Sequence, residues 1–301
     1  MTYSKPRRKK YLVDLKEGVV VGTFWTHVES GHNQEGTQLF KSIISAKEVE
    51  FDNPKPLRLI KRLLQIASKG ASDIILDFFS GSGTTAHAVM QSNAEEGMNR
   101  KFICIQIPES LDSCTETPKG PYKTIADIGK ERIRRTGDKI QTEWQEKRTG
   151  QLPLDEVAPT PPDVGFRVFC LDSSNLIPWD DSFVSPDQPE LFLERMDGNH
   201  GEAKPGRREI DVVYEVLIKH GVPLTEKIST LEIDEKRFYV IGETGYLFIC
   251  LTPNVAVSTI EAAIKHNPGA MIFSEHCFTD DNDLTNTGLA LDKAEIEFRW
   301  I

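Results

Sequence analysis

The stretch "ILDFFSGSGTTAHAVM", Ile75–Met90, decides how the first half of the chain folds. Apolar and aromatic residues surround Asp77, which is typical of a buried strand. Glycines and small hydroxyl residues follow, and apolar residues then recur at helical spacing through Ala86, Val89 and Met90. The stretch therefore predicts a strand, a glycine-rich turn and a helix, in that order.

The segments around this stretch complete a strand–helix–strand unit. Residues 57–67, "LRLIKRLLQIA", predict an amphipathic helix that follows Pro54 and Pro56. Residues 93–100 predict a loop, and Lys101–Ile107, "KFICIQI", predicts a second strand. The crossover between the two strands should be right-handed, which makes them parallel and puts helices on the faces of their sheet.

The rest of the chain predicts a long helix, a linker and a smaller α/β unit. Residues 124–148 predict one polar helix that is interrupted near Gly137. The proline-rich segment 149–165 lacks periodicity, so we interpret it as a linker. The elements predicted after it are a strand at Phe166–Leu171, a helix within 208–221 that stops at Gly221, a hairpin within 237–251, a helix at Ser258–His266 and a strand near 270–275.

Charge is unevenly distributed along the chain. The formal net charge is -10, but residues 1–150 hold 24 Lys and Arg against 19 Asp and Glu, whereas residues 151–301 hold 12 against 27. Different partners are expected for the two halves. Basic residues make up five of the first ten positions, and "GKERIRR" (Gly129–Arg135) is a second cluster. Each cluster either faces phosphates or is simply a solvated tail or helix face.

Composition excludes several classes of protein. The five cysteines are widely spaced, with no CxxC pair and no zinc-ligand spacing, so we expect reduced thiols and no metal site. No apolar run approaches the ~20 residues of a membrane-spanning helix, and no signal-peptide pattern follows the basic start. We therefore expect a cytoplasmic protein with no membrane partner.

The glycine-rich turn has features of a ligand site. Ligands of parallel sheets bind beyond the carboxyl ends of the strands, and Gly81 and Gly83 would let a ligand approach the main chain. Ser82, Thr84 and Thr85 add hydroxyl groups. The alternative is a tight turn that binds nothing, because a GxG spacing alone is weak evidence.

The usual nucleotide motifs are absent from this turn. No lysine follows Gly83 as in GxxxxGK[ST], and Ala86 replaces the third glycine of GxGxxG. A ligand that combines ribose, adenine and an amino acid fits better than a triphosphate. Asp77 is placed to accept from an ammonium group, and Gln106 or Glu109 at the end of the second strand is placed to bond ribose hydroxyls.

Four segments in order carry a family resemblance: "FDNPKPLRLIKRLL", "ILDFFSGSGTTAHAV", "NRKFICIQIPE" and "TIADIGKERIRR". Together they resemble the carboxyl half of the modification subunit of type III restriction-modification systems, a DNA methyltransferase that methylates adenine N6 with S-adenosyl-L-methionine. "GTFWTHVESGHNQEGTQLF" and "GFRVFCLDSSNLIPW" are also similar to segments of these proteins. The resemblance covers most of the chain.

The resemblance implies a fold and a domain order. It implies an α/β chain with a partial doubly wound, Rossmann-like methyltransferase sheet, followed by a smaller α/β carboxyl-terminal domain. Residues 1–148 would be the cofactor-binding part, with the end of the target-recognition region at 1–50. Residues 149–165 would be the linker, and residues 166–301 a carboxyl-terminal interaction domain.

The resemblance also implies site residues for S-adenosyl-L-methionine. Positions that match the family's cofactor loop are Asp77, Phe79, Gly81, Ser82, Gly83 and Thr84. Pro54, Lys55 and Pro56 match the PKP segment, whose helix covers the cofactor in the family. Many amino-methyltransferases end the second strand with an acidic residue that bonds the ribose; Gln106 occupies that position here, with Glu109 nearby.

No catalytic residue is assigned, because the family's catalytic loop is not found. That loop is Asp, Asn or Ser followed by Pro, Pro and an aromatic residue, and it holds the amino group of a flipped base. "TPPDV" (Thr160–Val164) has the prolines but neither the polar residue nor the aromatic one. We therefore expect a fragment without its catalytic half, with an exposed strand edge, an uncovered apolar face and marginal stability alone.

Three functional hypotheses remain. The first is a DNA adenine-N6 methyltransferase subunit that acts on DNA only when the missing amino-terminal half or a second modification subunit is supplied, alongside a helicase-nuclease restriction subunit. The second is a non-catalytic assembly piece whose acidic carboxyl-terminal domain docks the restriction subunit or another modification subunit. The third, an unrelated dinucleotide-binding protein, is disfavoured because GxGxxG and an acidic end to the second strand are missing.

Overall fold

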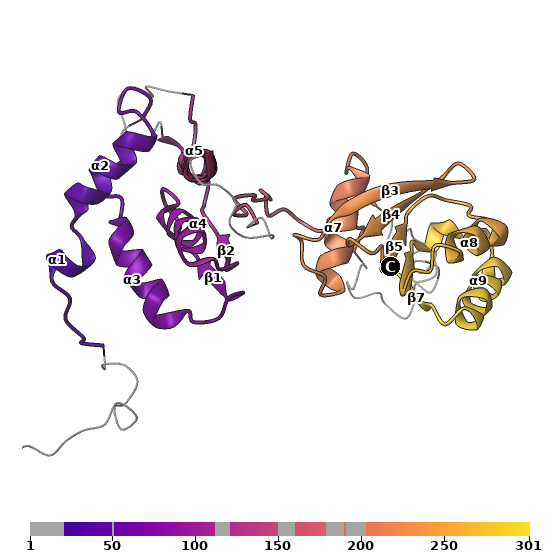
Figure 1. The fold of residues 1–301 in the computed structure, drawn as a ribbon. Helices are drawn as coiled ribbons and strands as arrows, with labels where there is room; N and C mark the ends of the chain where they lie inside the picture. Colours follow the sequence, from indigo (N-terminus) through magenta and orange to yellow (C-terminus); the bar gives the residue numbers. More distant parts are fainter. Residues whose placement is uncertain (1–20, 50, 112–120, 150–159, 179–189, 191–202) are drawn as a thin grey trace, which may run out of the picture. The chain divides into compact units, whose positions relative to one another are not determined.

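The computed structural model describes residues 21–49, 51–111, 121–149, 160–178, 190 and 203–301. The chain forms two compact units, residues 1–166 (unit 1) and residues 167–301 (unit 2), and each has its own sheet (Figure 1). The basic residues at 1–10, Cys114 and most of the predicted linker lie outside the described residues.

Unit 1 contains the predicted strand–helix–strand arrangement. Strand β1 (Ile74–Asp77) leads into helix α4 (Thr84–Glu96), which returns to strand β2 (Lys101–Cys104). The strands pair in parallel, with Leu76 opposite Ile103, so the predicted parallel pairing is confirmed. The predicted loop at 93–100 is partly wrong: α4 continues through residue 96 and ends where Gly97 takes a φ of +67°. Glycine adopts this left-handed conformation without steric cost.

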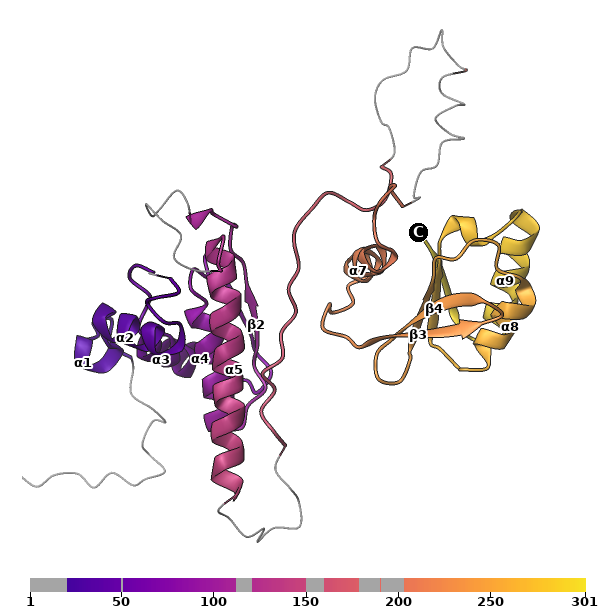
Figure 2. The ribbon, with the colours of Figure 1, turned by 90° about the horizontal axis from the view of Figure 1, so that it is seen from above.

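Three helices cover one face of this small sheet. Helix α3 (Leu57–Ala67), confirmed at its predicted bounds, packs on α4, and the long helix α5 (Ile125–Thr149) lies along the other side of α4 (Figure 2). The buried side chains at these contacts include Leu57, Leu64, Ala88 and Val89 from α3 and α4, together with Met90, Ile133 and Ile140 from α4 and α5.

Helix α5 continues through the position where an interruption was predicted. A β-carbon on Gly137 would lie 3.2 Å from Cβ of Val164, so the missing side chain makes room for the segment that passes over the helix. Val164 and Phe166 pack there against the cluster of Ala86, Met90, Ile133 and Ile140. Gly137 therefore allows Val164 to pack closely on α5 and does not interrupt the helix.

The opposite face of the two-stranded sheet is exposed. We call it the open sheet face; its large apolar residues are Ile74, Leu76, Phe78, Ile103, Ile105 and Ile107, all roughly half exposed or more. The prediction of a fully buried first strand is thus wrong, whereas the expected uncovered apolar face is confirmed. Within the described part of the chain, β1 pairs with β2 alone, so its other edge is also unpaired.

Two short helices precede this core. Helix α1 (His27–Ser30) is followed by α2 (Asn33–Ile43), which contacts α5. Phe40 and Ile44 from this region are buried with Tyr122 and Ile128 in a further cluster. Helix α2 and the residues after it, through Val49, therefore contribute to the core of unit 1.

Unit 2 is a three-layer α/β unit. Its sheet has the order β3-β4-β5-β6-β7, with β3–β5 antiparallel and β5–β7 parallel. The strands are β3 (Ile228–Ile233), β4 (Lys236–Ile241), β5 (Leu247–Cys250), β6 (Ala270–Phe273) and β7 (Glu297–Trp300). Helix α7 (Glu209–Lys219) covers one face, and α8 (Val257–Ile264) and α9 (Asp281–Lys293) cover the other (Figure 1).

Most predicted elements of unit 2 are confirmed. The helix that stops at Gly221, the hairpin, the helix near residue 260 and the strand near residue 272 are all present. The predicted strand at Phe166–Leu171 is wrong: the segment forms no strand, and Leu171 is fully exposed. The sequence did not identify β3, α9 or β7, whose polar residues weaken the apolar pattern. In the described residues of both units, every helix is too short or too polar to cross a bilayer.

Candidate functional site

The turn between β1 and α4, residues 77–84, is here called the glycine corner. Gly81 and Gly83 have φ values of +50° and +74°, in the left-handed region. Ser80 N donates to Ile105 O at 3.1 Å, and Gly83 N donates to Ser80 O at 2.8 Å. These bonds fix a tight turn at the carboxyl ends of both strands, where ligands of parallel sheets bind.

Asp77 and Gln106 hold the corner from two sides. The Asp77 carboxylate accepts from Phe79 N at 3.1 Å and from Thr85 Oγ1 at 2.5 Å. Gln106 Oε1 accepts from Gly81 N at 2.7 Å, and its Nε2 donates to Ile107 O at 3.1 Å. Both side chains predicted to bind ligand therefore also fix the main chain of the turn. Their ribose and ammonium contacts stay predictions.

Ser82 and Thr84 are buried, and their hydroxyls face a residue that sequence reasoning did not single out. Arg132, from α5, donates through Nη1 to Ser82 Oγ at 2.9 Å and to Thr84 Oγ1 at 2.7 Å. Arg132 is fully buried. The helical spacing of Ile128, Arg132 and Thr136 could have revealed it, because all three lie on the buried side of α5.

Helix α5 approaches the corner closely because glycines meet there. A β-carbon on Gly129 would lie 3.1 Å from Gly81 O, and one on Gly83 would lie 3.2 Å from Gly129 O. Arg132 Nη2 is 3.5 Å from His87 Nδ1. Burial and the charge of Arg132 lower the pKa of His87 to about 3, so this imidazole is neutral at pH 7.

Phe51, three residues before the PKP segment, lies beside the corner. Pro54 and Pro56 are buried, and Lys55 is exposed. The ring of Phe51 lies 3.6 Å from where a β-carbon of Gly81 would be, so the chain just before this segment is beside the turn. The structure does not bring Lys55 into contact with the corner, and Glu109 is likewise exposed.

Phe79 gives the corner an exposed aromatic ring. Its side chain is 86% exposed and that of the neighbouring Phe78 is 61% exposed, so aromatic surface is available to a ligand here. The bare main chain, the Asp77 carboxylate and this ring fit an amino-acid-bearing nucleoside. In the described residues no group of His, Cys, Asp and Glu could hold a metal ion. Val164 of the "TPPDV" segment is half-buried and packs against the cluster between α4 and α5.

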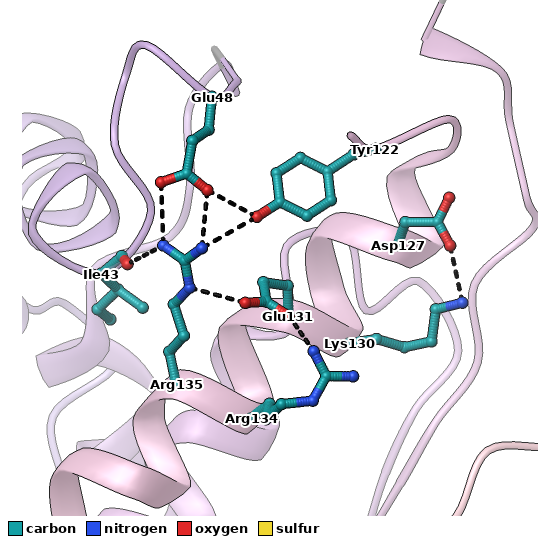
Figure 3. Close-up of polar contacts among 8 residues, drawn as sticks. All are labelled: Ile43, Glu48, Tyr122, Asp127, Lys130, Glu131, Arg134 and Arg135. Atoms are coloured by element: carbon teal, nitrogen blue, oxygen red, sulfur yellow. Dashed lines mark hydrogen bonds and ion pairs between the residues drawn. The ribbon is translucent and has the colours of Figure 1, made fainter. Parts of the chain in front are cut away.

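Side chains of the basic cluster Gly129–Arg135 form ion pairs within unit 1. Figure 3 shows Arg135 bound to Glu48, with Nη2–Oε2 and Nη1–Oε1 distances of 2.7 and 3.1 Å, and to Glu131. Arg134 also pairs with Glu131, and Lys130 pairs with Asp127 at 2.7 Å. Arg132 and Arg135 are thus engaged within unit 1, whereas Lys130 is partly exposed and Arg134 exposed, both in weak helical ion pairs, so the two interpretations of this cluster stay open for them.

The Glu48–Arg135 pair predicts a pH-dependent stability. Hydrogen bonds from Arg135 and Tyr122 hold the pKa of Glu48 at about 2, below its ordinary 4.5. Because this pKa is lowered by folding, the stabilisation is complete above pH 4.5 and disappears as the pH falls through about 2. The pair is one-third exposed, so we expect about 1 kcal/mol.

Urea unfolding of wild type and Glu48→Gln between pH 2 and pH 7 measures this contribution. The difference between the two proteins should be constant above pH 5 and shrink below pH 4. A difference that does not change with pH would show that the Glu48 charge contributes nothing to folding.

Comparison with known proteins shows which protein family this chain resembles. A sequence profile described as DNA methylase matches residues 1–113. The StyLTI Mod subunit of Salmonella typhimurium, a type III restriction-modification enzyme, is 39% identical over 136 residues, which are 45% of this chain and 20% of that protein. The EcoPI Mod subunit of Escherichia phage P1 is 38% identical over 120 residues, 40% of this chain and 18% of that protein.

A third relative covers a similar share of the chain. The EcoP15I Mod subunit of Escherichia coli is 30% identical over 159 residues, 47% of this chain and 24% of that protein. The chain thus spans about a fifth to a quarter of the length of the curated relatives it matches. Enzymes of this family take their methyl group from S-adenosyl-L-methionine. Residues 1–113 therefore match the DNA methylase family, and 40–47% of the chain is similar to Mod subunits of type III restriction-modification enzymes.

Proposed function

We propose that the chain is the cofactor-binding part of a site-specific DNA adenine-N6 methyltransferase of a type III restriction-modification system. It would bind S-adenosyl-L-methionine and methylate DNA only together with a separate part that carries the catalytic loop. Identity to three type III Mod subunits supports the family, and their greater length is consistent with further parts. DNA and a restriction subunit are the further partners proposed.

The glycine corner is the proposed cofactor seat. Bound S-adenosyl-L-methionine supplies an activated methyl group there. The Asp77 carboxylate would accept from its ammonium group, and the exposed ring of Phe79 would lie against its adenine or ribose. Gly81 and Gly83 leave the main chain open, and the first N–H groups of α4 are available at the helix start. Lys55, Gln106 and Glu109 are proposed as outer contacts.

The open sheet face is the observation that carries the proposal of a separate part. Parallel sheets in α/β proteins are covered by helices on both faces, but here only the Ile75 and Phe102 side is covered. Leu76 and Ile103 are 47% and 49% exposed on the other side. We propose that the catalytic part adds strands to β1 and helices to this face. Unit 1 would then be part of a doubly wound, Rossmann-like sheet, and unit 2 an interaction domain.

Reconstitution tests this function directly. The chain would be mixed with the catalytic-loop part of the StyLTI Mod subunit, and transfer of labelled methyl groups to DNA would be measured. We expect transfer by the mixture and none by either part alone. Calorimetry should show that the chain itself binds S-adenosyl-L-methionine. Methylation by the purified chain alone would refute the fragment proposal. If neither the chain alone nor the mixture binds S-adenosyl-L-methionine, the proposed cofactor site is refuted.

Changing the open sheet face should prevent reconstitution. Leu76→Lys puts a charge at the centre of that face, where a covering partner would have to bury it. Leu63→Lys is the matched control, because Leu63 is 43% exposed on α3, away from the sheet. We expect Leu76→Lys to reduce reconstituted transfer more than about tenfold, equivalent to ~1.4 kcal/mol. Equal activity of both variants would place the partner elsewhere.

A second candidate is an assembly piece without cofactor chemistry. Its support is the acidic character of residues 151–301 and the exposed apolar side chains of Val168, Phe169 and Leu171 at the start of unit 2. Such a piece would dock a restriction or modification subunit and bind no cofactor. Co-purification with either subunit, combined with an absence of heat on titration with S-adenosyl-L-methionine, would favour it.

A further inference from the structure

Arg132 is a buried cation without an acidic partner among the described residues. Its guanidinium is fully buried; among the described residues its polar and ring partners are the hydroxyls of Ser82 and Thr84, the His87 ring, and the face of Phe40 at 5.8 Å. Its Nε atom has no hydrogen-bond partner in the described part of the chain. Burying a charge in this way is costly, so its retention beneath the glycine corner calls for a functional reason.

The contacts of Arg132 determine what the corner presents. A guanidinium only donates, so Ser82 Oγ and Thr84 Oγ1 act as acceptors towards it at 2.9 and 2.7 Å. The unpaired positive charge adds to the positive end of the α4 dipole, which begins at Thr84. In a buried setting such a charge is weakly screened and acts over several ångströms. The Ser82 and Thr84 side of the corner is therefore polarised to receive a negative group, whereas the Asp77 carboxylate makes the strand end of the corner negative.

We propose that Arg132 is a positioning residue of the glycine corner, and that it selects ligands whose amino-acid part carries a carboxylate. Ser82 and Thr84 separate it from the turn's surface, so it acts through them and through its charge. This inference rests on the proposed function, because it concerns the same seat for S-adenosyl-L-methionine.

A pair of ligands tests the inference. S-adenosyl-L-methionine and its decarboxylated form differ in the carboxylate alone, and both keep the sulfonium and ammonium groups. The unaltered chain should bind the carboxylated ligand about tenfold more tightly, and Arg132→Met should bring the ratio of affinities close to one. Arg132→Lys keeps the charge and should retain most of the preference. The ratio is insensitive to partial unfolding, because the folded fraction scales both affinities equally.

Two further variants complete the experiment. Thr136→Val changes a buried hydroxyl one turn along the same face of α5 and should leave the ratio unchanged. If Arg132→Met does not fold, Arg132→Gln keeps hydrogen bonds to the hydroxyls without the charge and should also lose the preference. An undiminished preference in the folded uncharged variant, or no preference in the unaltered chain, overturns the inference while the cofactor site stands. Absence of binding of both ligands to the unaltered chain removes the proposed function itself.

Discussion

Gly83→Val should lower the affinity for S-adenosyl-L-methionine at least tenfold, a loss of ~1.4 kcal/mol or more. Gly83 has a φ of +74°, which a β-branched residue adopts only with strain. Its β-carbon would also lie 3.2 Å from Gly129 O, so the turn would have to move away from α5. Calorimetric titration of both proteins gives the ratio of affinities.

Gly97→Val provides the control for this substitution. Gly97 ends α4 with a φ of +67°, nearly the same conformation, but no atom lies within 4 Å of its would-be β-carbon. Both variants therefore carry similar backbone strain at opposite ends of one helix. We expect Gly97→Val to lose stability yet keep its affinity within about twofold, well under 1.4 kcal/mol. Equal losses of affinity in Gly83→Val and Gly97→Val would mean that the glycine corner is not the cofactor-binding site.

Gly36→Ala should destabilise unit 1 by about 1–3 kcal/mol, although alanine normally favours a helix. A β-carbon on Gly36 would lie 3.0 Å from both the carbonyl carbon and oxygen of Lys55, and closer still to Pro54 O. These are main-chain atoms, so the PKP segment or α2 would have to shift. Faster hydrogen exchange in peptides covering residues 51–67, together with a lower urea midpoint, would measure the effect.

Gly288→Ala is the matched helical control. Gly288 lies within α9 of unit 2, and its β-carbon would meet nothing closer than a Phe298 ring carbon at 3.9 Å. This substitution should be neutral or stabilise the chain by up to about 1 kcal/mol, because glycine disfavours the helix interior. If Gly36→Ala also leaves the stability of the chain unchanged or raises it, the PKP segment does not pack against α2.

The basic cluster illustrates why composition did not identify this site. The letters "GKERIRR" predict an exposed cation patch, yet the arginines have three different environments. Arg132 is buried under the corner, Arg135 binds Glu48, and Arg134 pairs with Glu131 on the surface. Only the rotation of α5 relative to its neighbours separates these environments. A helical projection would have placed Arg132 on the apolar side, but not against Ser82 and Thr84.

Strand β1 illustrates a different limit. Its run of apolar residues predicts a buried strand, and only the resemblance to longer proteins predicted an uncovered apolar face. In this chain the face with Ile75 is covered and the face with Leu76 is open. The residues of a strand are adapted to every element that packs on it, and another chain can supply some of these elements. Burial was thus predictable for one face only.

The sequence by itself determined the parallel strand–helix–strand unit, the glycine corner between β1 and α4, and the family, because these depend on residues close together in the chain. Handedness and left-handed glycines are local constraints that a short motif carries completely. Only the tertiary structure decided that Arg132 lies beneath the corner and that Gly36 leaves room for the PKP segment. These are contacts between residues roughly 20 to 50 positions apart, and they follow from how helices pack, which local patterns do not specify.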